Sequence, residues 1–162
     1  MDVYLWHGDE FDRSPRRLGM GNVPTAHLGQ RFHAYDFWND KYLGVIGPDY
    51  TKLCNQFEGQ LLRLTPLGKP GEPTLAGSDL HLTMGAAEIQ SLNYRDHGLE
   101  VELIAPAGAR SGHLTFVSDR PLKLDRATNC EAKLAQVGEK VWSLTLSHRS
   151  SEMNQHIRLT DH

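Results

Sequence analysis

Apolar and polar residues alternate with a period of two along most of the chain, and this alternation is typical of strands that bury one face. The clearest case is residues 99–103, where glutamates separate Leu99, Val101 and Leu103. Residues 113–117 and 141–146 repeat the pattern with the β-branched and aromatic residues that strands favour. The same alternation predicts strands at 2–6, 60–64, 79–83 and 156–159.

Turn-forming residues separate the predicted strands. The segments 47–49, 69–73 and 106–108 each contain glycine and proline, which favour tight turns. Gly138-Glu139 lies between two alternating runs and predicts a two-residue hairpin turn. Short strands with a turn about every ten residues are typical of a sandwich or barrel. We therefore predict an all-β chain, built as an antiparallel two-sheet β-sandwich with at most one short helix.

Residues 126–140 fit two structures. Asn129 is a suitable N-cap for a helix over 130–137, which would place Cys130, Leu134 and Val137 on one face. The same residues also fit a strand, which we favour while leaving the helix open. The segment 66–73 is rich in proline and glycine, but strands are predicted on both sides of it. We interpret it as a long loop within a single domain that spans residues 1–162.

Composition and charge narrow the class of protein. The chain has 162 residues, of which 23% are charged, and its net charge is −3. This is the composition of a globular protein, and it gives no general positive field for a polyanion, so we expect no nucleic-acid partner. The sequence contains no apolar run of bilayer-spanning length and no signal peptide pattern. We expect no membrane partner and assign no compartment.

The two cysteines, Cys54 and Cys130, lie far apart in the sequence. This spacing predicts neither a zinc ribbon nor a disulfide scaffold. We expect two buried or half-buried thiols, with one long-range disulfide as the alternative.

Acidic and histidine residues offer no complete metal-binding pattern. The acidic cluster near the N-terminus lacks the spacing of a calcium loop; it comprises Asp9, Glu10 and Asp12 beside His7. His81 and Glu88 match part of a cupin-type pattern, but position 83 is Thr where a second histidine ligand is needed. His27 and His33 lack helical ligand spacing. We therefore predict no metal ligand and no cofactor.

The sequence also lacks the nucleophile elbow and the phosphate-binding glycine motif, so no catalytic residue is predicted. The aromatic residues are the remaining candidates, because exposed rings can stack on the C–H faces of sugars. Tyr42 and Tyr50 flank predicted turns, and we expect them to be exposed and, with Trp38, to be candidate carbohydrate-binding residues. Trp6, Phe37 and Trp142 are expected in the core.

Three stretches of the sequence, taken in order, match motifs that occur together in one protein family. The first is residues 3–10, VYLWHGDE; the second is 35–44, YDFWNDKYLG, followed by 60–66, QLLRLTP; the third is 75–89, LAGSDLHLTMGAAEI. Together they resemble the C-terminal β-sandwich domain of melibiase-type, α-galactosidase-like glycoside hydrolases, in which the second stretch forms a hairpin. The resemblance covers residues 3–90, and Leu5 departs from the family, which carries Asn at that position.

The resemblance implies a function outside catalysis. In that family the sugar-cleaving carboxylates lie on a (β/α)₈ barrel that precedes this domain, and such a barrel takes about 250 residues. No catalytic residue can therefore be transferred to this chain. The resemblance implies a non-catalytic accessory domain, excised or naturally detached, whose partner is the catalytic barrel of a parent glycosidase.

The motif residues have architectural interpretations of their own. Asp36 is expected to accept hydrogen bonds from turn N–H groups, and Gly44 and Gly85 suit bulges or close backbone approach. His81 and Glu88 are expected to form a buried polar pair or to face the missing barrel.

Three functional hypotheses follow from these observations. The first is the accessory domain that packs on and stabilises a catalytic barrel. The alternative is a stand-alone, lectin-like module that binds glycans through exposed aromatic rings. The third, a small enzyme on a β-sandwich, requires His7, His81 or His113 to converge with carboxylates in a pocket.

Overall fold

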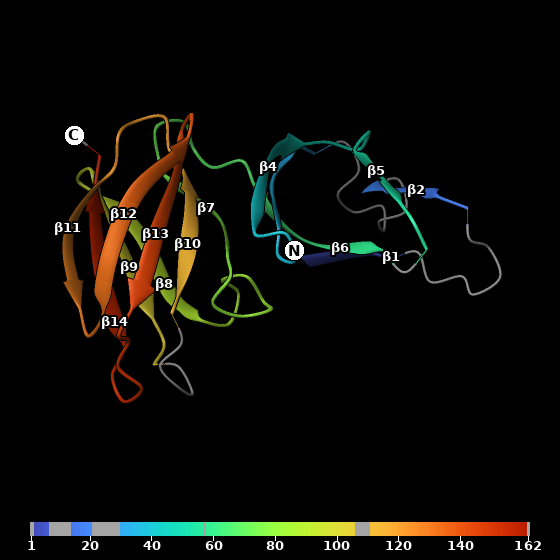
Figure 1. Cartoon of the computed structure of the whole chain (residues 1–162). Coiled ribbons are helices and arrows are strands. Elements are labelled where there is room, and N and C mark those ends of the chain that lie inside the picture. Colours follow the sequence, from blue (N-terminus) through green and yellow to red (C-terminus); the bar gives the residue numbers. More distant parts are fainter. Residues whose placement is uncertain (1, 7–13, 21–29, 57, 106–110, 162) are drawn as a thin grey trace. The chain divides into compact units, whose positions relative to one another are not determined.

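The computed structural model describes residues 2–6, 14–20, 30–56, 58–105 and 111–161 (Figure 1). These residues form 14 strands and no α-helix, and every strand pair is antiparallel, which confirms the predicted fold class. In the same residues, no helix is long and apolar enough to cross a membrane.

By its internal contacts the chain divides into two compact units, Met1–Leu67 and Gly68–His162. We call them the N-terminal and C-terminal units and describe each by itself. The boundary falls within the proline- and glycine-rich segment 66–73, and a single domain over residues 1–162 stays a prediction.

The N-terminal unit contains a four-stranded sheet in the order β1-β6-β3-β4 and a separate ribbon of β2 and β5. The bounds of these strands are β1 (Asp2–Trp6), β2 (Arg16–Gly19), β3 (Phe32–Asp36), β4 (Lys41–Ile46), β5 (Thr51–Cys54) and β6 (Gly59–Pro66). One face of the sheet packs against the ribbon around a core of Leu5, Met20, Phe32, Ala34, Ile46, Leu62 and Leu64. Because side chains alternate along a strand, the other face carries the intervening residues of β1, β6 and β3.

The C-terminal unit is a β-sandwich of two four-stranded sheets, ordered β12-β13-β10-β7 and β11-β14-β9-β8. Its strands are β7 (Thr74–Ser78), β8 (Ile89–Arg95), β9 (Gly98–Leu103), β10 (Gly112–Val117), β11 (Lys123–Thr128), β12 (Glu131–Gly138), β13 (Val141–Ser147) and β14 (Gln155–Thr160). Both sheets contribute to one core, in which Leu103, Phe116, Leu144 and Ile157 are fully buried, and Figure 1 shows the two layers.

The structure corrects one predicted strand and decides between the two structures left open for residues 126–140. Residues 79–83 are not a strand: β7 lies just before them, and 79–88 form bends and turns. The amide of His113 donates to Asp79 Oδ1 at 2.5 Å, and Leu80 N donates to Ser78 Oγ at 3.0 Å. Asp79 therefore accepts a backbone amide of β10 and Ser78 accepts one within the turn. Residues 131–138 are strand β12, so the helical alternative for 126–140 is wrong.

The β12–β13 hairpin turns one residue later than predicted. Gly138 still pairs with Val141, so Glu139 and Lys140 form the turn, and Lys140 adopts φ +62°. At the β8–β9 hairpin, Asp96 and His97 both have positive φ, +48° and +57°, as in the type I′ turn that matches strand twist.

Candidate functional site

Three aromatic side chains of the N-terminal unit lie together and remain about half exposed. Tyr4 is 53% exposed, Trp6 46% and Trp38 50%. The centroids of the Tyr4 and Trp6 rings are 6.0 Å apart with planes inclined by 28°. Trp38 approaches Tyr4 edge to face, with centroids 5.2 Å apart and planes at 87°. We call these three residues the aromatic cluster.

The local sequence explains why these rings project outward. In β1, Leu5 points into the core while Tyr4 and Trp6, two positions apart, share the opposite face. Opposite Trp6 on β6 is Gly59, where an added Cβ would lie 3.2 Å from Trp6 Cε3 and 3.3 Å from Tyr4 Cε2. The missing side chain lets both rings lie against β6. Trp38 belongs to the turn between β3 and β4.

This arrangement differs from the sequence prediction for Trp6 and Phe37. Trp6 was expected in the core but lies on the outer face of the edge strand β1. Phe37 is half-buried in the turn after β3. Trp142 is half-buried and packs against the core of the C-terminal unit, and Trp38 is exposed. Tyr4 received no specific role from the sequence, although its spacing from Trp6 in an alternating strand was a signal for a shared face.

Tyr42 and Tyr50 are half-buried rather than exposed as predicted. The Tyr42 hydroxyl lies 2.8 Å from His33 Nδ1. Burial raises the pKa of Tyr42 and lowers that of His33. The Tyr50 hydroxyl donates to Gln60 Oε1 at 2.8 Å. Burial also raises the pKa of Tyr50, against an opposing effect of the Gln60 hydrogen bond. Their role in carbohydrate binding stays a prediction.

Tyr50 also lines a pocket of about 480 Å³ beside the connection between β4 and β5. The pocket is also lined by Arg31, Val45, Gly47, Pro48 and Asp49. We call it the β4–β5 pocket. Its volume lies within the usual range for small-molecule sites, about 300–1,000 Å³.

Asp36 holds the turn of the β3–β4 hairpin, as predicted. Its Oδ1 accepts from the backbone N–H of Asn39 at 3.4 Å. Its Oδ2 accepts from the side-chain amides of Asn39 at 2.8 Å and Gln60 at 2.7 Å. Because Gln60 in turn accepts from Tyr50, a buried polar chain links the turn to the β4–β5 connection. Gly44 adopts φ +93° where the β3–β4 register shifts, and an added Cβ there would meet no atom within 4 Å, so of the two roles predicted for it a bulge fits better than close backbone approach.

His81 and Glu88 do not form a buried pair. His81 is exposed, and Thr83 stands between them: its hydroxyl donates to Glu88 Oε2 at 2.8 Å and lies 3.0 Å from His81 Nδ1. Gly85 adopts φ +105° in this turn, which is why glycine suits it. This segment therefore closes a tight turn.

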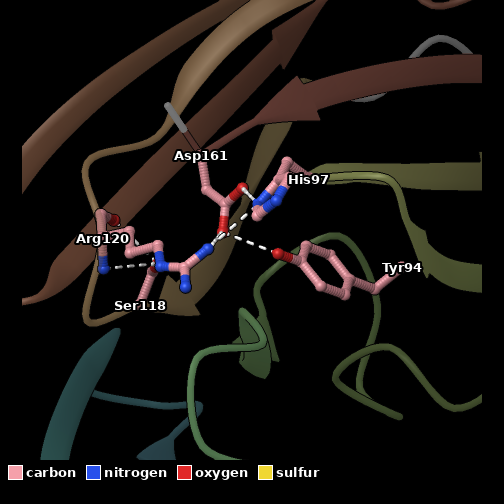
Figure 2. Close-up of polar contacts among 5 residues, drawn as sticks. All are labelled: Tyr94, His97, Ser118, Arg120 and Asp161. Carbon is pink, nitrogen blue, oxygen red and sulfur yellow. Dashed lines mark hydrogen bonds and ion pairs between the residues drawn. The ribbon is translucent and has the colours of Figure 1, made fainter.

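A polar network in the C-terminal unit surrounds the fully buried carboxylate of Asp161 (Figure 2). The Tyr94 hydroxyl donates to Oδ2 at 2.7 Å, and Arg120 Nη1 donates to the same oxygen at 3.4 Å. His97 Nδ1 lies 3.2 Å from Oδ1. Ser118 donates its hydroxyl proton to the Arg120 carbonyl at 2.7 Å, and not to His97, so these residues do not build a nucleophile–base pair.

The electrostatics of this network favour a charged Asp161. Burial disfavours the carboxylate, but the Tyr94 hydrogen bond and the neighbouring Arg120 and His97 outweigh it, so the pKa of Asp161 is below its ordinary value. The same hydrogen bond, with burial second, raises the pKa of Tyr94. The network ties the chain after β14 to the β8–β9 turn of the same sheet and to the β10–β11 loop, which connects the two sheets.

The remaining sequence candidates lie as follows. His113 Nδ1 lies 3.2 Å from Asp79 Oδ2, next to the turn after β7. Cys54 is buried and Cys130 half-buried, and both are free thiols as expected. His7, the acidic residues at 9, 10 and 12, and His27 lie outside the described residues.

Comparison with known proteins adds no family to this description. No protein-family model matches the chain, and no curated protein matches it significantly. The resemblance to melibiase-type domains therefore stays a prediction that rests on the sequence motifs.

Proposed function

We propose that this chain is a non-catalytic accessory module of a glycoside hydrolase and that its aromatic cluster contacts carbohydrate. The observation that carries the proposal is the gathering of three half-exposed rings on one surface of the N-terminal unit. The family resemblance of residues 3–90 supplies the carbohydrate context. Two of its motif stretches contain rings of this cluster: Tyr4 and Trp6 in the first, Trp38 in the second.

The physical reason lies in the shape and polarity of the rings. An aromatic face carries a partial negative charge that attracts the polarised C–H groups on the apolar face of a pyranose. Trp38 stands nearly perpendicular to Tyr4, so the cluster offers two walls instead of one plane. A contiguous group of rings this exposed is typical of an interaction site.

Titration of the whole chain with galactosides and glucosides tests the proposal, with tryptophan emission and NMR shifts as readouts. We expect saturable binding that Trp6→Ala and Trp38→Ala each weaken by about tenfold, which corresponds to about 1.4 kcal/mol. Leu53→Ala, which removes another exposed apolar side chain of the same unit, is the matched control and should leave the affinity unchanged. Absence of any binding, or equal loss in all three variants, contradicts carbohydrate contact at the cluster.

A second candidate function uses the same rings as the surface that packs on the catalytic barrel. It is favoured by the chemistry of the cluster, which exposes large apolar area of the kind that protein interfaces bury. Hydroxyl-radical footprinting distinguishes the two. Docking predicts that Trp6 and Trp38 are protected when the chain is joined to a glycosidase barrel, with no sugar binding by the isolated chain. Carbohydrate contact predicts protection by sugar alone.

A further inference from the structure

We infer that the β4–β5 pocket of the N-terminal unit is a second binding site, for one neutral pyranose ring. The inference rests on the proposed carbohydrate function but on residues outside the aromatic cluster, so the two can fail separately. The pocket lies within one unit and is formed by Arg31 and the segment 45–50.

Apolar and aromatic groups line part of the pocket. Tyr50, Pro48 and Val45 are among the residues that line it. The Tyr50 hydroxyl is held by Gln60 at 2.8 Å, and the Tyr50 amide donates to the Gly47 carbonyl at 3.1 Å. The first bond holds the ring by its hydroxyl, and the second holds the backbone of the same residue. A fixed ring loses little conformational entropy when a ligand stacks on it.

Two charged residues that form no stabilising contact in the described part of the fold also line this pocket. Within the described residues, Arg31 and Asp49 are exposed and neither side chain takes part in a hydrogen bond or ion pair. An added Cβ at Gly47 would lie 3.0 Å from Asp49 Oδ1 and 3.8 Å from Arg31 Cγ. The absence of a side chain at position 47 therefore lets both groups approach the pocket floor.

This pair of groups determines the class of ligand. A guanidinium offers only donors and a carboxylate only acceptors, so together they match adjacent hydroxyls that donate and accept at once. Because their charges cancel, the pocket favours a neutral sugar over a phosphorylated or carboxylated one. An anionic ligand would face Asp49, and a cationic one would face Arg31.

NMR titration of the whole chain with neutral methyl pyranosides tests this site, with the backbone amides of Gly47, Asp49 and Tyr50 as local reporters. We expect saturable shifts at these amides, and we expect Arg31→Ala and Asp49→Asn each to weaken the binding that they report by about tenfold. Arg95→Ala, which removes an exposed arginine that lines a pocket of the C-terminal unit, is the matched control and should leave it unchanged.

The outcomes separate this site from the aromatic cluster. Shifts at 47–50 that survive Trp6→Ala and Trp38→Ala but disappear in the two pocket variants support the inference even where the cluster binds nothing. Binding that is sensitive only to the tryptophan variants leaves the proposed function standing and overturns the pocket. No shift at Gly47, Asp49 and Tyr50 at saturating sugar, or tighter binding of a sugar phosphate than of the neutral sugar, also overturns it.

Discussion

Replacing Asp161 with asparagine tests whether the network of Figure 2 stabilises the C-terminal unit. The substitution keeps the size of the side chain and removes its negative charge. It also replaces one acceptor oxygen with an NH₂ group, so only one oxygen remains to accept hydrogen bonds from the Tyr94 hydroxyl and Arg120. Because the Asp161 side chain is fully buried, water cannot compensate for the mismatch.

The magnitude follows from the exposure of each partner. A hydrogen bond to a buried charged group contributes about 1.5–3 kcal/mol, and the Tyr94 bond at 2.7 Å is of this kind. The Arg120 and His97 side chains are 47% and 58% exposed, so solvent screens their charges and each adds less than about 1 kcal/mol. We expect Asp161→Asn to lower the free energy of unfolding by about 2–4 kcal/mol.

The measurement needs a reporter for the C-terminal unit alone. The chain has three tryptophans, of which only Trp142 belongs to this unit, where it packs against the core. In a Trp6→Phe/Trp38→Phe background, guanidinium unfolding followed by Trp142 emission reports that unit. Tyr94→Phe should cost about 1–2 kcal/mol and Arg120→Ala less than about 1 kcal/mol.

The pH dependence has a defined sign. The pKa of Asp161 is lower in the folded state, so its stabilisation is complete above the ordinary aspartate pKa of about 3.9 and is lost as pH falls through the folded value. The pKa of Tyr94 is raised, so its contribution is complete below about pH 10 and is lost as pH rises further. The difference between wild type and Asp161→Asn should therefore shrink as pH falls below about 3.9 and again as pH rises above about 10. A loss below about 0.5 kcal/mol, or an Arg120 variant that costs more than the Tyr94 variant, would refute this account.

The remaining predictions concern the N-terminal unit and use Trp6 and Trp38 emission in a Trp142→Phe background. Gly59→Ala should cost about 1–3 kcal/mol and shift the folded-state emission, because the added Cβ would lie 2.5 Å from the Leu5 carbonyl oxygen. Gly44→Ala adds its Cβ to open space at φ +93°, so backbone strain alone should cost about 1–2 kcal/mol with unchanged emission; an emission shift as large as that of Gly59→Ala would contradict this. Asp36→Ala removes the acceptor of the buried Gln60 amide group and should cost about 2–3 kcal/mol, and a loss under about 1 kcal/mol would show that the amide finds another partner.

The strands could be predicted from the sequence because burial of one face imposes a period of two. Residues 99–103 and 156–159 became β9 and β14, adjacent in one sheet. Residues 79–83 show the limit of this reasoning. They alternate equally well, but Asp79 accepts the His113 amide at 2.5 Å and the chain turns. A local pattern does not register a competing hydrogen bond to a residue 34 positions away.

The candidate site was less predictable for a related reason. Alternation shows that Leu5 and Trp6 face opposite ways but not which face another layer covers, so Trp6 was expected in the core and lies outside. The Asp161 network joins Tyr94 to a residue 67 positions later, and the β4–β5 pocket joins Arg31 to Asp49 through a turn. Neither spacing belongs to a local motif, so only the assembled strands bring these groups together.

Some polar and aromatic side chains form contacts that stabilise the fold, whereas others remain exposed, and the exposed ones are the better candidates for function. In the C-terminal unit, the titratable groups of the Asp161 network bind one another and hold the β8–β9 turn and the β10–β11 loop to the chain after β14. In the N-terminal unit, the described structure leaves three rings half exposed and turns Arg31 and Asp49 toward a pocket without binding them to each other. Exposed rings and open polar groups contribute little to folding, because neither is fully removed from water. We therefore expect Asp161 variants to lower the free energy of unfolding and to leave the sugar affinity unchanged. Variants of Trp38 or Arg31 should lower the sugar affinity and leave the free energy of unfolding nearly unchanged.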